Sequence, residues 1–394
     1  MSAVAERVRP AKSSFLNDAK VRGVFYQILV FASLVAFFWW IIHNTVSNLN
    51  RLNISSGFGF MNGRAGFDLG QTLISYSSDS NYWDALLVGL LNTLLVAVIG
   101  IVTATLIGFL IGVGRLSRNW LIAKICTVYV ELFRNIPPLL VIFFWYFGVL
   151  SILPQPKQSL ELPFGAYLNN RGFTLPKPIF EEGSGLILAG LFAAIIIAIF
   201  VRGWAKTRQA ATGQQFPIGW TTLGLIIGLP LLGYFLSGMP VSFDMPKKST
   251  FNLVGGLQIG PELLSLYLAL SFYTASFIAE IVRGGILGIS KGQTEASFSL
   301  GMKPGPTMRQ VIIPQALRII IPPLTSQYLN LTKNSSLAIA IGYADLVAVG
   351  GTILNQTGQA IEIVAIWMLI YLGLSLTTSF FMNWFNSRMA LVER

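Results

Sequence analysis

Charged residues and the usual catalytic side chains are scarce in this 394-residue chain. Charged residues make up 11% of the sequence and hydrophobic residues 54%, whereas an ordinary soluble domain carries about 25% charged residues. The single cysteine, Cys126, excludes an internal disulfide, and the single histidine, His43, excludes a histidine-based metal site. We therefore predict a chain outside the soluble globular class, with no metal site and no cofactor.

Several catalytic motifs are also absent. The sequence contains no G-x-x-x-x-G-K-[ST] phosphate loop, so we do not expect this chain to hydrolyse ATP. It offers no Ser-His or Cys-His pair other than an improbable one with His43. The carboxylates Glu262, Asp345 and Glu362 are dispersed over separate apolar segments, which argues against a paired-carboxylate proton relay. We predict no catalytic residues and no enzyme activity.

Long apolar runs dominate what is present. Runs near 18 residues or longer are candidates for membrane spans, and eight such stretches occur, near 24–42, 86–113, 136–153, 186–201, 218–236, 263–282, 319–341 and 361–382. The first is too long for a typical signal peptide and lacks a small-residue cleavage site, so it is interpreted as a retained anchor. The pattern predicts an all-α polytopic membrane protein with about eight transmembrane helices and both termini on the same side.

Lysine and arginine indicate which side that is. With the N-terminus in the cytoplasm, 18 of the 27 basic residues fall in inside segments (7–22, 115–134, 202–208, 283–309 and 388–394) and only seven fall in outside loops. The positive-inside rule therefore predicts cytoplasmic termini. The net charge of +11 follows from this bias and from anionic lipid headgroups, so it does not argue for nucleic acid.

The segment 292–314 is a polar interruption between two apolar runs. Ser290-x-x-Gln293 and Thr307-x-x-Gln310 have the form of capping boxes, which satisfy free N–H groups at a helix start. Gly301 suits a left-handed stop for the first helix, and the prolines at 304 and 306 prevent that helix from continuing into the second. We predict two short helices joined at a fixed angle, on the cytoplasmic side.

This segment resembles, with the right spacing, the EAA loop of the permeases of ABC importers. Ser297 replaces the second alanine of the family motif, Val311 its isoleucine and Ile313 its leucine. In that family the loop docks into a cleft on the ATPase subunit. The residues that the resemblance assigns to coupling with the ATPase are Glu295, Ala296, Ser297, Gly301, Val311, Ile313 and Pro314.

The order of the segments resembles the binding-protein-dependent permeases for polar amino acids. That family implies a type I importer (MetI-like) core of five spans, here formed by 86–153 and 261–394, with the coupling loop at 290–314. Residues 1–85 (basic tail, first span and outside loop) and 154–260 (two spans with Pro-rich outside loops) are then additions. A long insertion at this place is typical of the larger general L-amino-acid permeases.

A candidate hinge lies before the third apolar run. Glu131 and Arg134 are three residues apart on a predicted helix and could pair, and Pro137-Pro138 suits the first turn of the next helix. The segment resembles FRGTPLLVQ of the amino-acid permeases. One interpretation is an interfacial salt bridge that stabilises the start of a helix. The other is a hinge near the inner mouth of the pathway, formed by Glu131, Arg134 and Pro137.

Charged residues also end the sixth run, just before the polar segment. Ser276, Glu280 and Arg283 share one helix face at i, i+4 and i+7. They either anchor the helix end or transmit motion from the ATPase, and the segment resembles the YxAExxRGG run of the family. Glu280 and Arg283 are candidate coupling residues, and Tyr273, Thr274 and Ser276 are candidate pathway residues.

The seventh run carries a polar cluster. Counted from Arg318 at the cytoplasmic edge, Asn330 lies about 18 Å into the membrane. Polar groups at this depth face the bundle interior or a water-filled cavity, so the cluster is either an interhelical contact or a lining for a zwitterion. It resembles the KNTSL run of the family, and Pro322-Pro323 is expected to break the helix. The candidate pathway residues here are Gln327, Asn330, Lys333, Asn334 and Ser335.

These features favour the permease subunit of an ATP-driven importer of L-amino acids in the bacterial inner membrane. Implied partners are a homologous second permease subunit, a cytoplasmic ATPase dimer, a periplasmic amino-acid-binding protein and membrane lipids. An ion-coupled secondary transporter is the alternative, although we find neither an internal repeat nor a dedicated carboxylate. A polytopic membrane enzyme is a third class, which the missing nucleophile and metal clusters disfavour.

Overall fold

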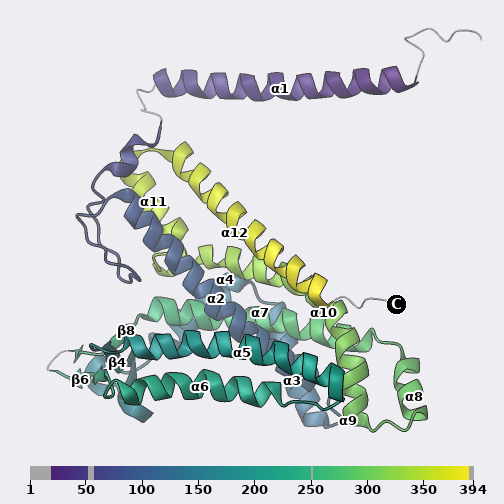
Figure 1. The fold of residues 1–394 in the computed structure, drawn as a ribbon. Coiled ribbons are helices and arrows are strands. Elements are labelled where there is room, and N and C mark those ends of the chain that lie inside the picture. Colours follow the sequence, from purple (N-terminus) through teal and green to yellow (C-terminus); the bar gives the residue numbers. More distant parts are fainter. Residues whose placement is uncertain (1–18, 52–56, 250–251, 390–394) are drawn as a thin grey trace, which may run out of the picture.

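The computed structural model describes residues 19–51, 57–249 and 252–389 as a mainly helical chain (Figure 1). The basic tail, with Arg7, Arg9 and Lys12, lies outside the described residues, as does Arg394. The helices are α1 (Ala19–Arg51), α2 (Tyr82–Gly114), α3 (Trp120–Arg134), α4 (Pro138–Phe143), α5 (Gly185–Thr212), α6 (Ile218–Leu236), α7 (Pro261–Leu287), α8 (Lys291–Ser299), α9 (Pro304–Thr307), α10 (Ile313–Asn334), α11 (Leu346–Thr357) and α12 (Ala360–Met389).

The number of spans agrees with the prediction at its upper limit. Six described helices are long and apolar enough to cross a membrane, and up to eight spans result if each of two bent helix pairs counts as one. One pair joins Trp120–Arg134 to Pro138–Leu150 at 110°, and the other joins Pro304–Ile341 to Leu346–Thr357 at 52°. The segment between the second and third predicted spans was expected to be a basic turn. That prediction is wrong, because the segment contains helix α3.

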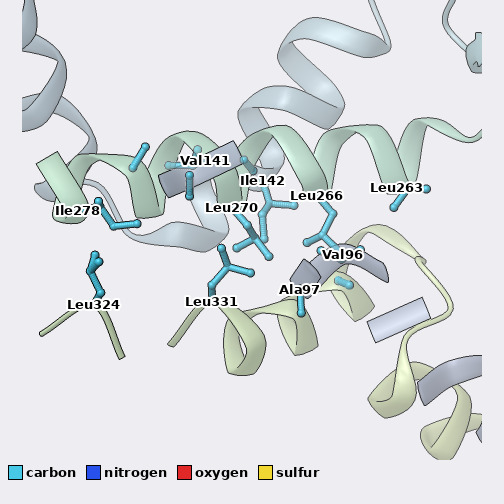
Figure 2. Packing of buried hydrophobic residues seen from close by; sticks show 14 of the residues in the cluster. Val96, Ala97, Val141, Ile142, Leu263, Leu266, Leu270, Ile278, Leu324 and Leu331 are labelled. Atoms are coloured by element: carbon cyan, nitrogen blue, oxygen red, sulfur yellow. The ribbon is translucent and has the colours of Figure 1, made fainter. Parts of the chain in front are cut away.

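The main core forms where α2, α4, α7 and α10 meet. Figure 2 shows Leu270 of α7 pointing toward Leu331 of α10, with Val96 and Ala97 of α2 beside them. Small residues let the backbones approach closely, as is common between membrane helices. A Cβ at Gly108 would lie 2.6 Å from the Cβ of Ile278. Larger side chains at this position would therefore push α2 and α7 apart.

A second core joins the start of α2 to α11 and α12. Ala85 and Leu86 of α2 pack with Leu346 and Ile353 of α11 and with Ile363 of α12, all nearly inaccessible to solvent. By contrast, α1 lies apart from the other helices in Figure 1, and its described side chains are mostly exposed. The first apolar run therefore forms the expected single helix, and no described residue covers its apolar surface.

The insertion contains two helices and three small antiparallel sheets. Helices α5 and α6 pack against each other, and Gly190 comes close to the Leu229 carbonyl. The Pro-rich segments expected to be loops instead contain strands: β1 (Leu160–Leu162), β2 (Ala166–Asn169), β3 (Gly172–Leu175), β4 (Lys177–Phe180), β5 (Val241–Asp244), β6 (Lys247–Lys248), β7 (Leu253–Val254) and β8 (Leu257–Ile259). The sheets have the orders β1-β2-β3-β8, β4-β5 and β6-β7.

The expected break at Pro322-Pro323 is wrong. Both prolines lie inside α10, which continues to Asn334 and then into a 3₁₀ helix, Ser335–Ile341. The chain bends farther on, where Gly342 adopts a left-handed conformation (φ +77°) and Asp345 caps α11. The bend therefore lies where one helix ends and another starts, rather than at the prolines.

Candidate functional site

In the polar segment 292–314, the first predicted helix and the turn after it are both present. Ser290 is the N-cap of α8, and its hydroxyl accepts a hydrogen bond from the Gly292 N–H (3.3 Å). Gly301 follows the helix with φ +76°, a conformation that costs a residue with a Cβ free energy. Pro304 occupies the first turn of α9, where its missing N–H costs nothing. The local sequence therefore determines the first helix, the turn after it and the start of α9.

Both predicted capping boxes are wrong. At the first, the Ser290 hydroxyl accepts from the Gly292 N–H rather than from Gln293, and the Gln293 side chain contacts Gln315 instead. Thr307 does not begin a helix, because α9 already starts at Pro304, and the buried Thr307 hydroxyl has no hydrogen-bond partner in the described chain. A π-helical turn, Met308–Ile312, follows, in which the Ile313 N–H donates to the Met308 carbonyl. Because Pro314 has no N–H, it cannot make the usual helical bond at this point. Such π turns often occur at functional sites.

The loop presents an exposed surface held on a rigid frame. Glu295 and Ala296 are exposed, whereas Ser297 is buried and its hydroxyl donates to the Gln293 carbonyl (2.7 Å). Leu300 is 82% exposed, so an apolar side chain stands free at the tip. Of the remaining motif residues, Val311 and Pro314 are half-buried and Ile313 is 41% exposed.

One side-chain contact ties α8 to the helix that follows the loop. The Gln315 amide donates to the Gln293 amide oxygen (3.2 Å) across the turn. The exposed face of the loop also carries Phe298 and Met308, 48% and 44% accessible. The loop also carries one exposed carboxylate, Glu295, and the exposed basic residues Lys291, Lys303 and Arg309. Apolar side chains among charges of both signs on a pair of helices are suited to contact with another protein.

An ion cluster lies where α2, α3 and α7 meet. The Arg115 guanidinium contacts the Glu280 carboxylate, and the Arg283 Nη2 lies 2.6 Å from the other oxygen of Glu280. Arg115 also approaches Glu131 of α3 (3.8 Å). The expected Glu131–Arg134 pair is therefore wrong, and Arg134 instead lies over the Phe277 ring (5.6 Å). Arg115, which follows α2 directly, is the cluster residue that the sequence motifs did not identify.

The hinge candidate Pro137 lies at a sharp bend. It is the residue before α4, and the helices on its two sides, α3 and the Pro138–Leu150 segment, meet at 110°. The bend follows from chemistry, because Pro138 at the first helical position is favourable while two prolines cannot extend α3. The position of Pro137 agrees with a hinge geometry, with α3 tied to α2 through Glu131 and Arg115.

The polar groups of α10 lie on the side away from the core. Leu324 and Leu331 point toward α7 (Figure 2), whereas Ser326, Asn330 and Lys333, spaced at i, i+4 and i+7, are exposed. The predicted residues Gln327 and Asn334 are half-buried, and Ser335 is buried with its hydroxyl donating to the Thr332 carbonyl (2.7 Å). The cluster is therefore an exposed polar stripe rather than a packed contact within this chain.

The candidate pathway residues on α7 differ from those on α10. Thr274 and Ser276 are buried in the core, and the Ser276 hydroxyl donates to the Tyr273 carbonyl (2.6 Å). Tyr273 is half-buried. Within this chain, Thr274 and Ser276 therefore face neighbouring helices, and the structure does not bring them to the stripe on α10.

The bend after α10 is held by a buried amide that the motifs did not identify. Asn92 of α2 is inaccessible to solvent, and its Nδ2 donates to the carbonyls of Gln71 (3.1 Å) and Ala344 (2.9 Å). The Tyr343 hydroxyl donates to the Asn92 carbonyl (3.3 Å). Asn92 thus fixes two chain segments to α2. No group of three or more His, Cys, Asp or Glu side chains suited to a metal occurs in the described part of the chain.

Proteins with similar sequences indicate the family to which this chain belongs. A family model described as "Binding-protein-dependent transport system inner membrane component" matches residues 104–391. The chain is 67% identical over 381 residues to the general L-amino acid transport system permease protein AapQ of Rhizobium johnstonii, covering 97% of this chain and 95% of that protein. It is 51% identical over 382 residues to the putative amino-acid ABC transporter permease protein YhdX of Escherichia coli, covering 97% of each.

A third relative is the glutamate/glutamine/aspartate/asparagine transport system permease protein BztB of Rhodobacter capsulatus. It is 44% identical over 418 residues, with 97% of each chain covered. The family match and the helical architecture together confirm the predicted fold class, an all-α polytopic type I importer subunit. This chain belongs to the family of binding-protein-dependent transport system inner membrane components and is a permease subunit of an ABC importer.

Proposed function

We propose that this chain is the permease subunit of an importer that moves L-amino acids of broad specificity from the periplasm to the cytoplasm. The observation that carries the proposal is the loop 290–314, which presents exposed apolar side chains among charges of both signs on a two-helix frame. The similarity to amino-acid permeases supports the amino-acid substrate. Both termini and the loop are proposed to be cytoplasmic, as the distribution of basic residues favours.

The power source is a separate pair of ATPase subunits. The chain itself contains no phosphate loop, so ATP must be hydrolysed by a partner. Nucleotide binding closes the ATPases, and this closure moves the loop together with the end of α7. The resulting change is a shift between two packings of the helices, driven by the difference in their affinities for the nucleotide-bound ATPase.

The ion cluster is suited to transmit that movement. Glu280 and Arg283 lie one to two turns before the end of α7, close to the start of α8, and Arg115 joins Glu280 to α2. Glu131 extends the connection to α3 and so to the bend at Pro137. A displacement of the loop therefore reaches three helices through a single set of charged contacts.

The pathway is proposed to run along the exposed stripe of α10. An exposed lysine and asparagine on a membrane helix are costly against lipid, so such groups face a protein partner or a water-filled cavity. A homologous second permease subunit facing Asn330 and Lys333 would provide both. Gln327 and Asn334, at the edge of the stripe, offer hydrogen bonds to the substrate. A periplasmic binding protein delivers the substrate on the side of the membrane opposite to the loop 290–314.

The loop assignment is tested by a charge reversal. Glu295→Lys should abolish co-purification of the ATPase, because an exposed contact carboxylate becomes a cation, while the permease still inserts into the membrane. Glu181→Lys is the matched control, since Glu181 is also exposed but belongs to the insertion. Retention of the ATPase by the Glu295→Lys variant would show that the loop is not its docking surface.

A further inference from the structure

A cavity of about 470 Å³ lies between the insertion and the core, at the end of α7 far from the loop. It is large enough for a small ligand, because such sites typically measure 300–1,000 Å³. Four separate parts of the chain supply its walls: the segment before α2, the insertion, the start of α7 and the bend after α10. The polar side chains that line the cavity include Gln71, Asn170, Arg171, Gln258, Glu262 and Tyr343.

The insertion is held firmly at this place. Strand β3 pairs with β8, and the turn between β2 and β3 lies directly against the chain that leads into α7. Gly172, at φ +104°, allows this approach, because a Cβ there would collide with the Ile259 carbonyl. The Gln258 amide donates to the Arg171 carbonyl (3.1 Å) and fixes the turn. Arg171 is thus positioned on the same wall as the start of α7.

The lining residues offer both charges and a free acceptor. The Arg171 side chain is exposed, and its guanidinium has no hydrogen-bond or salt-bridge partner within 57–249 and 252–389. Glu262, on the first turn of α7, accepts a hydrogen bond from the Tyr146 hydroxyl through one carboxylate oxygen (3.2 Å). The side-chain oxygen of Asn170 is buried and lacks a partner among the described residues. A buried acceptor without a donor is costly and invites a ligand N–H.

This set of groups matches the two ends of an α-amino acid. A guanidinium binds a carboxylate through two parallel hydrogen bonds, and a carboxylate together with an amide oxygen suits an ammonium group. The amides of Gln71 and Gln258 at the wall can hydrogen-bond to varied side chains without requiring one of them. A protein partner would instead be expected to meet an apolar surface with aromatic anchors.

The location connects the cavity to transport. Glu262 lies about 38 Å along α7 from the end that joins the loop, which exceeds the hydrocarbon thickness of about 30 Å. Figure 1 accordingly shows the strands of the insertion at the opposite end of α7 from α8. The bend that follows α10 also contributes Gly342, Tyr343 and Ala344 to the wall, so the chain that continues from the polar stripe forms part of the cavity.

We propose that this cavity is an outer binding site for zwitterionic amino acids, in which Arg171 holds the carboxylate and Glu262 with Asn170 holds the ammonium group. The inference rests on the proposed function, and it assigns to the insertion a direct part in substrate capture. Because recognition is directed to the backbone of the amino acid, the site accepts many side chains.

Equilibrium binding to the purified complex of permeases and ATPase tests this site, without ATP and without the binding protein. The probes are L-leucine and L-glutamine, with isoamylamine and 4-methylpentanoate as leucine analogues that lack the carboxylate or the amine. Arg171→Ala and Glu262→Gln should each weaken L-leucine binding about tenfold or more. Arg171→Ala should no longer prefer leucine to isoamylamine, and Glu262→Gln should no longer prefer it to 4-methylpentanoate. Arg64→Ala and Glu161→Gln, at exposed ion pairs outside the cavity, should bind as the unmodified complex does.

Two results would overturn the proposal: no amino-acid binding by the unmodified complex, or unchanged analogue preferences in both variants. Gel filtration and retention of the ATPase verify that each variant is assembled. Failure of the proposed function is separately visible, because it removes ATP-driven uptake by the unmodified complex, whereas failure of this site leaves that uptake intact.

Discussion

At the scale of single residues, the role of Lys333 in the proposed substrate pathway can be tested directly. Lys333 is exposed on α10, in line with Asn330 and opposite the buried Leu331. If this ammonium faces the substrate pathway, Lys333→Met should reduce uptake by about tenfold or more while the complex still assembles, because a charge-assisted contact to the substrate is lost. Uptake in proteoliposomes and yield of assembled complex measure the two effects.

The matched control is Lys206→Met on α5, which removes an exposed lysine from the insertion. This variant should transport normally. Equal losses of uptake and assembly for Lys333→Met would instead indicate that Lys333 has a packing role at an interface.

Single residues also show where sequence reasoning succeeds and fails. The left-handed Gly301 and the Ser290 cap were predictable, because both signals act within a few residues of each other. The pairing of Glu131 was not, since Arg115 and Arg134 compete for it and only the packing of α3 against the end of α2 decides. Asn92 carries no local signal, because its partners Gln71 and Ala344 are distant in sequence. Arg171 carries none either, because the pairing of β3 with the distant β8 decides its place.

At the scale of elements, the turn between α8 and α9 is the part whose shape matters most. Nothing lies within 4 Å of a Cβ built on Gly301, but its φ of +76° is unfavourable for residues other than glycine, asparagine and aspartate. Gly301→Val should therefore strain the turn by about 1–2 kcal/mol and abolish co-purification of the ATPase. The measurement is the ATPase retained on the immobilised permease.

Gly301→Asn tests whether the conformation of the turn matters or merely the presence of a side chain, since asparagine tolerates the left-handed conformation. It should retain far more ATPase than Gly301→Val. If both variants retain the ATPase fully, the geometry of the turn is not needed for docking.

Elements shorter than a membrane span were the least predictable. Helix α3 lies in a stretch interpreted as a basic turn, although Asn119 caps it in the usual way, with its side chain accepting from the Leu121 N–H (2.9 Å). Helix α11 lies between the seventh and eighth apolar runs and was not predicted, despite its Asp345 cap and the left-handed Gly358 at its end. Strand β3 pairs with β8, and β4 with β5, across long stretches of sequence, so local patterns could not reveal these pairings.

At the scale of the whole molecule, the two surfaces for which we propose functions lie at opposite ends of α7. The loop 290–314 follows one end, and the cavity between insertion and core lies at the other. In this proposal, the ion cluster and the polar stripe of α10 connect the coupling surface to the pathway. The central claim is that import is driven through the loop by an external ATPase rather than by an ion gradient through this chain alone.

Reconstituted uptake tests that claim most directly. Proteoliposomes containing the permease subunits are loaded with ATP, with or without the ATPase, and uptake of L-amino acids presented by the binding protein is followed before and after an ionophore. The account predicts uptake that requires the ATPase and survives the ionophore. Uptake by this chain without the ATPase, collapsing when the ionophore is added, would contradict it and support an ion-coupled transporter.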